Sequence, residues 1–120
     1  MQVDKVIPVL RIFDYAKAIE FYRDWLEFEV EWEHRFEPGA PVYIQLTKNG
    51  ITLHLSEHHG DGSPGIQIFV WCTGLKTYHE ALLAKRYTYG HPGLEKAFYE
   101  AWSMQVIDPF GNKITFNEKI

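Results

Sequence analysis

The sequence lacks the marks of several protein classes. Its 120 residues contain a single cysteine, Cys72, which excludes an internal disulfide and the paired Cys-x-x-Cys motifs of many zinc and redox sites. No apolar run approaches the length of a membrane span, and no signal-peptide pattern is visible near the N-terminus. We therefore expect a cytoplasmic protein that does not cross a membrane.

The chain also lacks an excess of basic residues. Lysine and arginine number 12 against 16 aspartates and glutamates, and the formal net charge is −4. Binding to nucleic acid depends on a basic face that neutralises phosphates, so this balance disfavours nucleic acid as the main partner. A cationic ligand suits an acidic chain better.

Apolar and aromatic residues are plentiful. A hydrophobic fraction of 46% with 23% charged residues is typical of a globular protein, and the length suits one domain. Aromatic residues make up 16% of the chain, more than one small core usually needs. We expect some of them to line a groove or a subunit interface.

The first third of the chain predicts a strand, a helix and a second strand. Residues 6–12 form a β-branched and aliphatic run, and Asp14 is a suitable helix N-cap. Apolar residues then recur at helical spacing: Tyr15, Ala18, Ile19, Tyr22 and Leu26. Over residues 28–36 the period falls to two, which predicts a strand with one aromatic face and one charged face.

Two further strands are predicted over residues 42–47 and 51–56. Asn49 and Gly50 lie between them, and both tolerate the positive φ angles that a two-residue hairpin turn needs. The glycine-rich segment 58–64 is typical of a flexible polar linker.

The remaining residues repeat this order. Residues 65–72 predict a strand, and Thr73 is the expected N-cap of a helix over 73–86. The rest of the chain is expected to form a short strand at 87–89, an irregular stretch at 90–98 and strands at 100–107 and 113–117. Asp108 is expected to cap the amides of the turn between the last two strands.

The order strand-helix-strand-strand-strand thus occurs twice. It predicts an α+β fold of two βαβββ modules with mixed sheets in a single domain, with module one at about 1–57, a linker at about 58–64 and module two at about 65–120. One helix covers one face of its sheet, so the uncovered faces must meet each other or a second chain. A cleft and a homodimer are therefore expected.

Three segments carry a family resemblance. Residues 7–32 (IPVLRIFDYAKAIEFYRDWLEFEVEW), 70–85 (VWCTGLKTYHEALLAK) and 106–118 (VIDPFGNKITFNE) resemble the glyoxalase, bleomycin resistance and extradiol dioxygenase group, the vicinal oxygen chelate superfamily. The resemblance implies this paired-module fold. It does not fix one activity, because the fold hosts isomerases, dioxygenases, hydrolases and binding proteins.

The resemblance also implies where metal ligands would lie. The four ligand positions of the superfamily's enzymes fall on or near Ile7, on His54, on or near Ile66 and on Thr115. Only His54 has a metal-binding side chain, and a zinc or iron site needs at least three protein ligands. We therefore expect no metal and no other cofactor, and we assign no catalytic residue.

The motifs VIPVL, VWCTG and DPFGN are most similar to the bleomycin resistance-like branch. That likeness implies a homodimer that exchanges an N-terminal strand at Pro8 and holds a drug in grooves at the subunit interface, without chemistry. Before the final hairpin the chain reads AFYEAW, where relatives often carry a Trp-Gly pair, so the ligand differs or is unknown.

Eight side chains are the candidates for ligand binding. In the first module they lie on the second and fourth predicted strands. In the second module they lie at residues 98–102, where the irregular stretch ends and the next predicted strand begins. They are Trp32, His34, Phe36, His54, Phe98, Tyr99, Glu100 and Trp102. The aromatic rings could stack on a flat or cationic ligand, and Glu100 could pair with an amine. As alternatives, Trp32 and Trp102 belong to the core, and the Glu27 to Glu33 row is only a solvated edge.

The sequence analysis therefore predicts a metal-free protein that sequesters an aromatic, cationic small molecule such as a bleomycin-like antibiotic. The first alternative is a divalent-metal-dependent glyoxalase-type lyase or extradiol-type dioxygenase with His54 as one ligand. The second alternative is a non-catalytic regulatory or interaction module on the same fold. Three or more histidine or glutamate side chains that converge would favour the lyase or dioxygenase.

Overall fold

The computed structural model describes residues 1–120, which form two compact units, Met1–Pro64 and Gly65–Ile120. Each unit contains one helical segment and one four-stranded mixed sheet, in the order strand-helix-strand-strand-strand. The predicted α+β fold of two βαβββ modules is therefore confirmed. No helix is long and apolar enough to cross a membrane.

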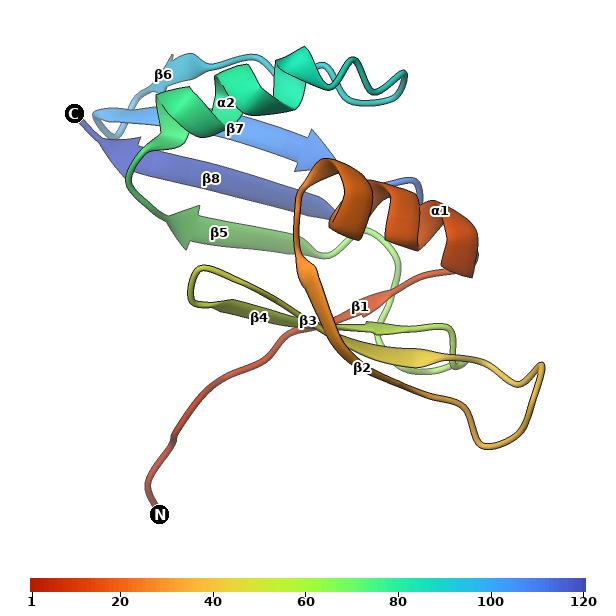
Figure 1. Ribbon diagram of the computed structural model, residues 1–120. Coiled ribbons are helices and arrows are strands. Elements are labelled where there is room, and N and C mark those ends of the chain that lie inside the picture. The colour runs from red at the N-terminus through yellow and green to blue at the C-terminus, as the bar shows by residue number, and fades with distance from the viewer. The chain divides into compact units, whose positions relative to one another are not determined.

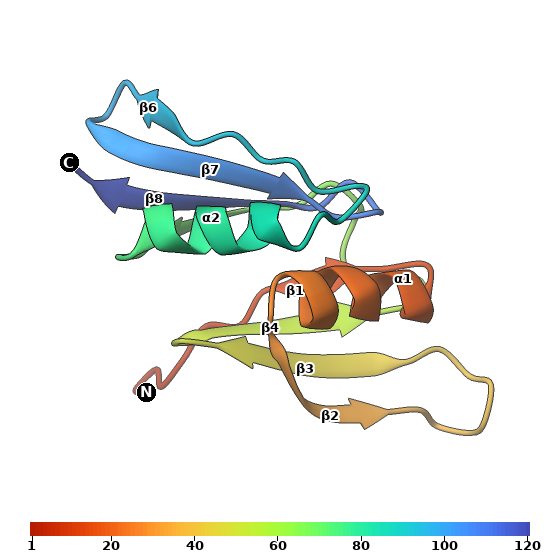
Figure 2. The same cartoon turned by 45° about the horizontal axis from the view of Figure 1, so that its top comes forward.

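The first unit carries its helix over one face of its sheet (Figures 1 and 2). Its strands stand in the order β1-β4-β3-β2, with β1 parallel to β4 and the other pairs antiparallel. The elements are β1 (Val9–Arg11), α1 (Tyr15–Ile19), a π-helical continuation η1 (Glu20–Trp25), β2 (Glu29–His34), β3 (Tyr43–Lys48) and β4 (Ile51–Ser56).

The second unit has the same plan, with the strand order β5-β8-β7-β6 and β5 parallel to β8. Its elements are β5 (Gln67–Trp71), α2 (Leu75–Ala84), β6 (Glu95–Ala97), β7 (Ala101–Ile107) and β8 (Lys113–Lys119). The ring of Tyr78 on α2 contacts the ring of Phe116 on β8 at 5.5 Å, which identifies the face of this sheet that the helix covers.

The first helix begins where the sequence predicts. Asp14 adopts an extended conformation, and its Oδ1 accepts the N–H of Lys17 at 2.9 Å. The second half of the helix widens, because Leu26 donates its N–H to the carbonyl of Phe21, five residues back. This wider turn accommodates four large apolar side chains, all at most 2% exposed: Phe21, Tyr22, Trp25 and Leu26.

Strand β2 departs from its predicted alternation because it contains a β-bulge. Val30 lies opposite Leu46, whereas Trp32 lies opposite Gln45, so two residues of β2 match one of β3 between these pairs. Val30 therefore lies on the helix-covered face and Trp32 on the opposite face. The expected division of this strand into one aromatic and one charged face is wrong.

The turn between β3 and β4 is confirmed as a two-residue hairpin loop. Asn49 and Gly50 have φ angles of 46° and 95°, and Lys48 pairs with Ile51 across the turn. The turn before β8 also forms as expected, since Oδ1 of Asp108 accepts the N–H groups of Phe110 and Asn112, both at 2.8 Å.

The start of α2 differs from the prediction, which took Thr73 as its N-cap. The cap position is Gly74, with a left-handed φ of 73° and no capping side chain of its own. The carboxylate of Glu118 on β8 accepts the N–H groups of Gly74 at 3.2 Å and Leu75 at 2.9 Å. The free amides of this helix are thus satisfied from a distant strand rather than by a local cap.

The predicted strand at residues 87–89 is wrong, because these residues form a turn in which Gly90 donates its N–H to the carbonyl of Tyr87. The short strand is β6 instead, within the stretch expected to be irregular. Its residues Glu95 and Ala97 pair with Ser103 and Ala101 of β7. A three-residue edge strand of polar composition has no alternation that could reveal it.

Replacement of Glu118 by alanine should destabilise the protein by about 1 kcal/mol, the usual loss when a helix cap is removed. The measurement is the midpoint of urea unfolding. Glu80 lies exposed on α2 with no capping role, so Glu80→Ala is the matched control and should change stability by less than about 0.5 kcal/mol. Equal effects of the two substitutions would contradict the capping role.

Candidate functional site

The uncovered face of the first unit's sheet carries polar and aromatic side chains. Cross-strand partners share a face, and the pairs Trp32–Gln45 and Gln45–His54 place these three side chains in a row across β2, β3 and β4. His34 lies beside Tyr43 in the neighbouring row. The opposite face is apolar, and its residues are fully buried: Leu10, Ile44, Leu46, Leu53 and Leu55.

Four side chains on the uncovered face form a continuous hydrogen-bonded chain. The Tyr43 hydroxyl lies 2.7 Å from Nδ1 of His54, and Nε2 of His54 lies 2.8 Å from Oε1 of Gln45. Nε2 of Gln45 then donates to Oε1 of Glu31 at 2.7 Å. The bulge residue Glu31 thus contacts the uncovered face, although its row was expected to be a solvated edge.

A cavity of about 350 Å³ opens beside this chain. Its lining side chains are Trp32, His34, Phe36, Tyr43, His58 and Asp61. The rings contact one another: Trp32 stacks on Tyr43 with centroids 6.0 Å apart, and Phe36 meets His34 and His58 edge to face at 4.8 and 5.9 Å. Aromatic walls around one carboxylate are suited to a flat cation.

The acid of this cavity comes from the segment expected to be a flexible linker. Asp61 Oδ2 accepts the hydroxyl proton of Ser56 at 2.8 Å, and Ser56 Oγ accepts the N–H of His58 at 3.0 Å. These bonds hold the segment against the end of β4. The sequence analysis did not propose Asp61, Tyr43 or His58 for the site, and it placed Asp61 and His58 in the flexible linker.

The surroundings of His54 and Tyr43 keep both side chains uncharged at neutral pH. Burial lowers the pKa of His54, which disfavours its imidazolium form. Burial, with a smaller contribution from the negative charge of Asp61, raises the pKa of Tyr43. His54 is thus a neutral imidazole and Tyr43 a neutral phenol at physiological pH.

The second unit brings some of its predicted residues together on its own uncovered face. Tyr99 contacts the rings of Phe69 and Trp71 at 5.8 and 6.0 Å and of Phe98 at 5.1 Å. Its hydroxyl donates to Oδ1 of Asn117. We name Phe69, Trp71, Phe98 and Tyr99 the aromatic wall. Phe98 is 96% exposed and the two rings on β5 are each 50% exposed.

The other two candidates of this unit lie elsewhere. Trp102 pairs with Glu118, the residue that caps α2, and so lies on the helix-covered face, away from the aromatic wall. Glu100 is exposed in the turn before β7, with a left-handed φ of 53°. Their participation in ligand binding stays a prediction.

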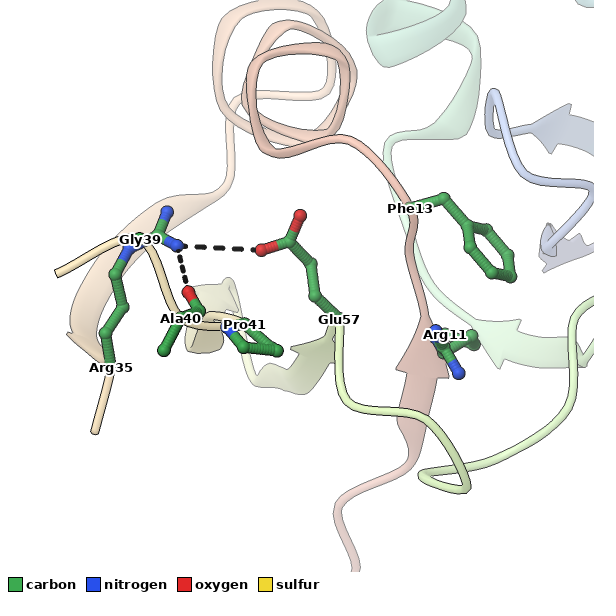
Figure 3. A pocket seen from close by; sticks show the side chains of 7 residues that line it. All are labelled: Arg11, Phe13, Arg35, Gly39, Ala40, Pro41 and Glu57. Carbon is green, nitrogen blue, oxygen red and sulfur yellow. Dashed lines mark hydrogen bonds and ion pairs between the residues drawn. The ribbon is translucent and has the colours of Figure 1, made fainter. Parts of the chain in front are cut away.

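A second cavity of about 310 Å³ lies near the same end of the first unit's sheet, where β1, β2 and β4 end (Figure 3). Arg35 donates to the carbonyl of Ala40 at 2.6 Å and lies 3.7 Å from Glu57, whose Oε1 also accepts the N–H of Val42. Arg11 lies over the ring of Phe13 at 4.5 Å. The contacts of Arg35 and Glu57 fasten the connection between β2 and β3, which is a structural role.

The donor set of each unit does not fit a divalent metal. Both ring nitrogens of His54 are within hydrogen-bond distance of Tyr43 or Gln45. No group of three or more histidine, cysteine, aspartate or glutamate side chains lies close enough to hold a metal ion. Structural and catalytic zinc sites need at least three such ligands.

The family model described as "Glyoxalase superfamily protein" matches residues 1–120, the whole length of the chain. The chain belongs to the glyoxalase superfamily. This confirms the resemblance carried by the three segments. No curated protein sequence matched it.

Solved structures from this superfamily share the fold. A bleomycin-binding protein complexed with bleomycin is 16% identical, with 98% of this chain and 100% of that chain covered and a TM-score of 0.71. TnmS3, an antibiotic binding protein from Streptomyces sp. CB03234, is 15% identical, with 100% and 99% covered and a TM-score of 0.74. A bleomycin resistance determinant encoded on transposon Tn5 is 14% identical, with 98% of each chain covered and a TM-score of 0.72.

The pH dependence of stability should reveal the half-buried imidazole of His54. The pKa of folded His54 lies below its ordinary value of 6.5, so between these two values the unfolded chain binds more protons than the folded one. Stability should therefore fall as the pH drops through 6.5 and stop falling below the folded pKa. Urea unfolding midpoints from pH 7.5 to 5 measure this, and His54→Gln should lack this component.

The control is His59→Gln in the exposed part of the linker, which should keep the pH dependence of the wild type. An unchanged pH profile in His54→Gln would show that the imidazole at this position is as solvated in the folded chain as in the unfolded one.

Proposed function

We propose that this protein binds an aromatic, cationic small molecule and acts by stoichiometric sequestration, without a metal or other cofactor. The observation that carries the proposal is the first unit's cavity, which is lined by aromatic rings together with the acidic residue Asp61. Rings supply stacking and cation–π attraction, and the carboxylate supplies the opposite charge.

The exposure of the rings supports this function. Trp32 is 42% exposed and Phe36 is 79% exposed, although both are large apolar side chains. A flat ligand between them removes this apolar surface from water, which favours binding by about 25 cal/mol per Å² before the costs of association are subtracted. The acidic net charge of −4 favours approach of a cation.

The comparisons support a ligand of the antibiotic type. Two of the solved structures with this fold are described as a bleomycin-binding protein and an antibiotic binding protein. We therefore propose a bleomycin-like or other aromatic cation as the ligand class and antibiotic resistance as the biological role, in the cytoplasm.

We further propose that the functional form is a homodimer with the ligand groove at the subunit interface, and that Pro8 is the point of strand exchange. Pro8 directly precedes β1, and its carbonyl accepts the N–H of His54 at 3.0 Å. The exposed aromatic wall of the second unit is the surface that we propose as the other contributor to ligand binding.

Calorimetric titration with 2-naphthylmethylammonium and with bleomycin tests the binding function. We expect saturable binding of both, and we expect the ammonium to bind more tightly than neutral 2-naphthylmethanol or anionic 2-naphthylacetate. Phe36→Ala should weaken binding by about 2- to 30-fold, because it removes one stacking ring. Asp61→Asn should weaken binding of the ammonium by about 10- to 100-fold, because it removes a charge-assisted contact.

Two matched controls lie outside the cavity. Tyr89→Ala removes an exposed ring of the second unit, and Asp24→Asn removes an exposed carboxylate that pairs with Arg23. Both should leave affinity unchanged. Equal affinity for the cation, the alcohol and the acid, or no binding of these three probes and of bleomycin, would reject the proposed function.

A further inference from the structure

The hydrogen-bonded chain on the uncovered face has a fixed direction, which is set at its acidic end. The carboxylate of Glu31 can only accept hydrogen bonds. The amide nitrogen of Gln45 must therefore point toward Glu31, at the observed 2.7 Å. The amide oxygen of Gln45 then points toward His54, at 2.8 Å from Nε2.

This orientation fixes the protons of the next two residues. An amide oxygen only accepts, so Nε2 of His54 must carry a proton. His54 is neutral, because burial lowers its pKa, and a neutral imidazole has one protonated nitrogen. Nδ1 is therefore an acceptor, and the hydroxyl of Tyr43, 2.7 Å away, donates its proton to it.

Two of the residues that line the cavity, Tyr43 and Asp61, consequently carry hydrogen-bond acceptors. The proton of Tyr43 is committed to His54, so the phenolic oxygen offers only its lone pairs to a ligand. Asp61 uses Oδ2 to accept the Ser56 hydroxyl, and the structure gives no hydrogen bond to its Oδ1. Asp61 lies close enough to Tyr43 for its charge to raise the pKa of the phenol.

We propose that this cavity selects aromatic ligands whose cationic group carries N–H donors, such as a primary or secondary ammonium or an amidinium, over quaternary ammonium ligands, through the Tyr43 oxygen held as an acceptor by His54, Gln45 and Glu31. This proposal rests on the proposed function and names the ligand class of the same cavity. Tyr43 is the specificity-determining residue, and His54, Gln45 and Glu31 are positioning residues.

The selection has a simple physical basis: both kinds of ligand carry a positive charge, but only one carries hydrogen-bond donors. Both kinds of cation gain from the aromatic rings and from the charge of Asp61. Only the N–H-bearing cation can also donate to the Tyr43 oxygen, and a bound quaternary ligand covers that acceptor without supplying a donor. A hydrogen bond from a charged donor is worth about a tenfold or greater factor in affinity.

Calorimetry with two probes of the same ring system tests the selection. We expect wild-type protein to prefer 2-naphthylmethylammonium over 2-naphthylmethyl-trimethylammonium by about tenfold. Tyr43→Phe keeps the ring and removes only the oxygen, so the preference should fall to near unity while the quaternary probe still binds. The change in affinity between wild type and variant is measured for each probe separately. The effect of the larger trimethyl group on affinity is present in both proteins and therefore cancels in this comparison.

The matched control is Tyr89→Phe, which removes an exposed phenol oxygen of the second unit and should keep the preference. A second variant, Gln45→Met, removes the amide that orders the protons and should reduce the preference in part. The tautomer of His54 is read by nitrogen NMR of the free protein, where we expect the proton on Nε2 and a bare Nδ1.

Each outcome decides the proposal. Equal binding of both probes by the wild type, or an unchanged preference in Tyr43→Phe, overturns the selection and leaves the proposed function standing. A proton on Nδ1 of His54 overturns the proton order and the proposal with it. If neither probe nor bleomycin binds, the proposed function and this inference both fail.

Discussion

The bulge in β2 is the constraint on which the first unit's site depends. One extra residue between Val30 and Trp32 changes which face the following side chains occupy. Without it, Trp32 and His34 would join Phe28 and Val30 on the buried face, and the cavity would lose two of its walls. The bulge also places Glu31 within 2.7 Å of Gln45, where the hydrogen-bonded chain ends.

The polar side chains of the hydrogen-bonded chain are tolerated on this face because each one forms a hydrogen bond with the next. An imidazole placed between two strands without partners would cost free energy, whereas His54 has partners at both nitrogens. The same set of bonds fixes which atom donates in each of them, because the last group, the Glu31 carboxylate, can only accept. The hydrogen bonds that stabilise this face are therefore the same ones that make the Tyr43 oxygen an acceptor.

The two units use one plan for different surfaces. In each, a helix covers one face of a sheet in which the first and last strands are parallel. In the first unit the uncovered face carries the hydrogen-bonded chain beside aromatic rings, whereas in the second it carries the aromatic wall, with Lys119 over the ring of Trp71 at 5.4 Å. Repetition of element order thus constrains architecture but leaves the chemistry of each face free.

The sequence alone determined the features that are set by neighbouring residues. The Asp14 cap, the Asn49-Gly50 turn and the Asp108 turn form as predicted, because each depends on bonds within a few residues. The order of elements followed from the two hydrophobic periods. Tertiary structure alone decided the bulge, the capping of α2 by Glu118 and the position of Asp61 beside Tyr43. These depend on residues that meet only after the strands have paired, so no local pattern encodes them.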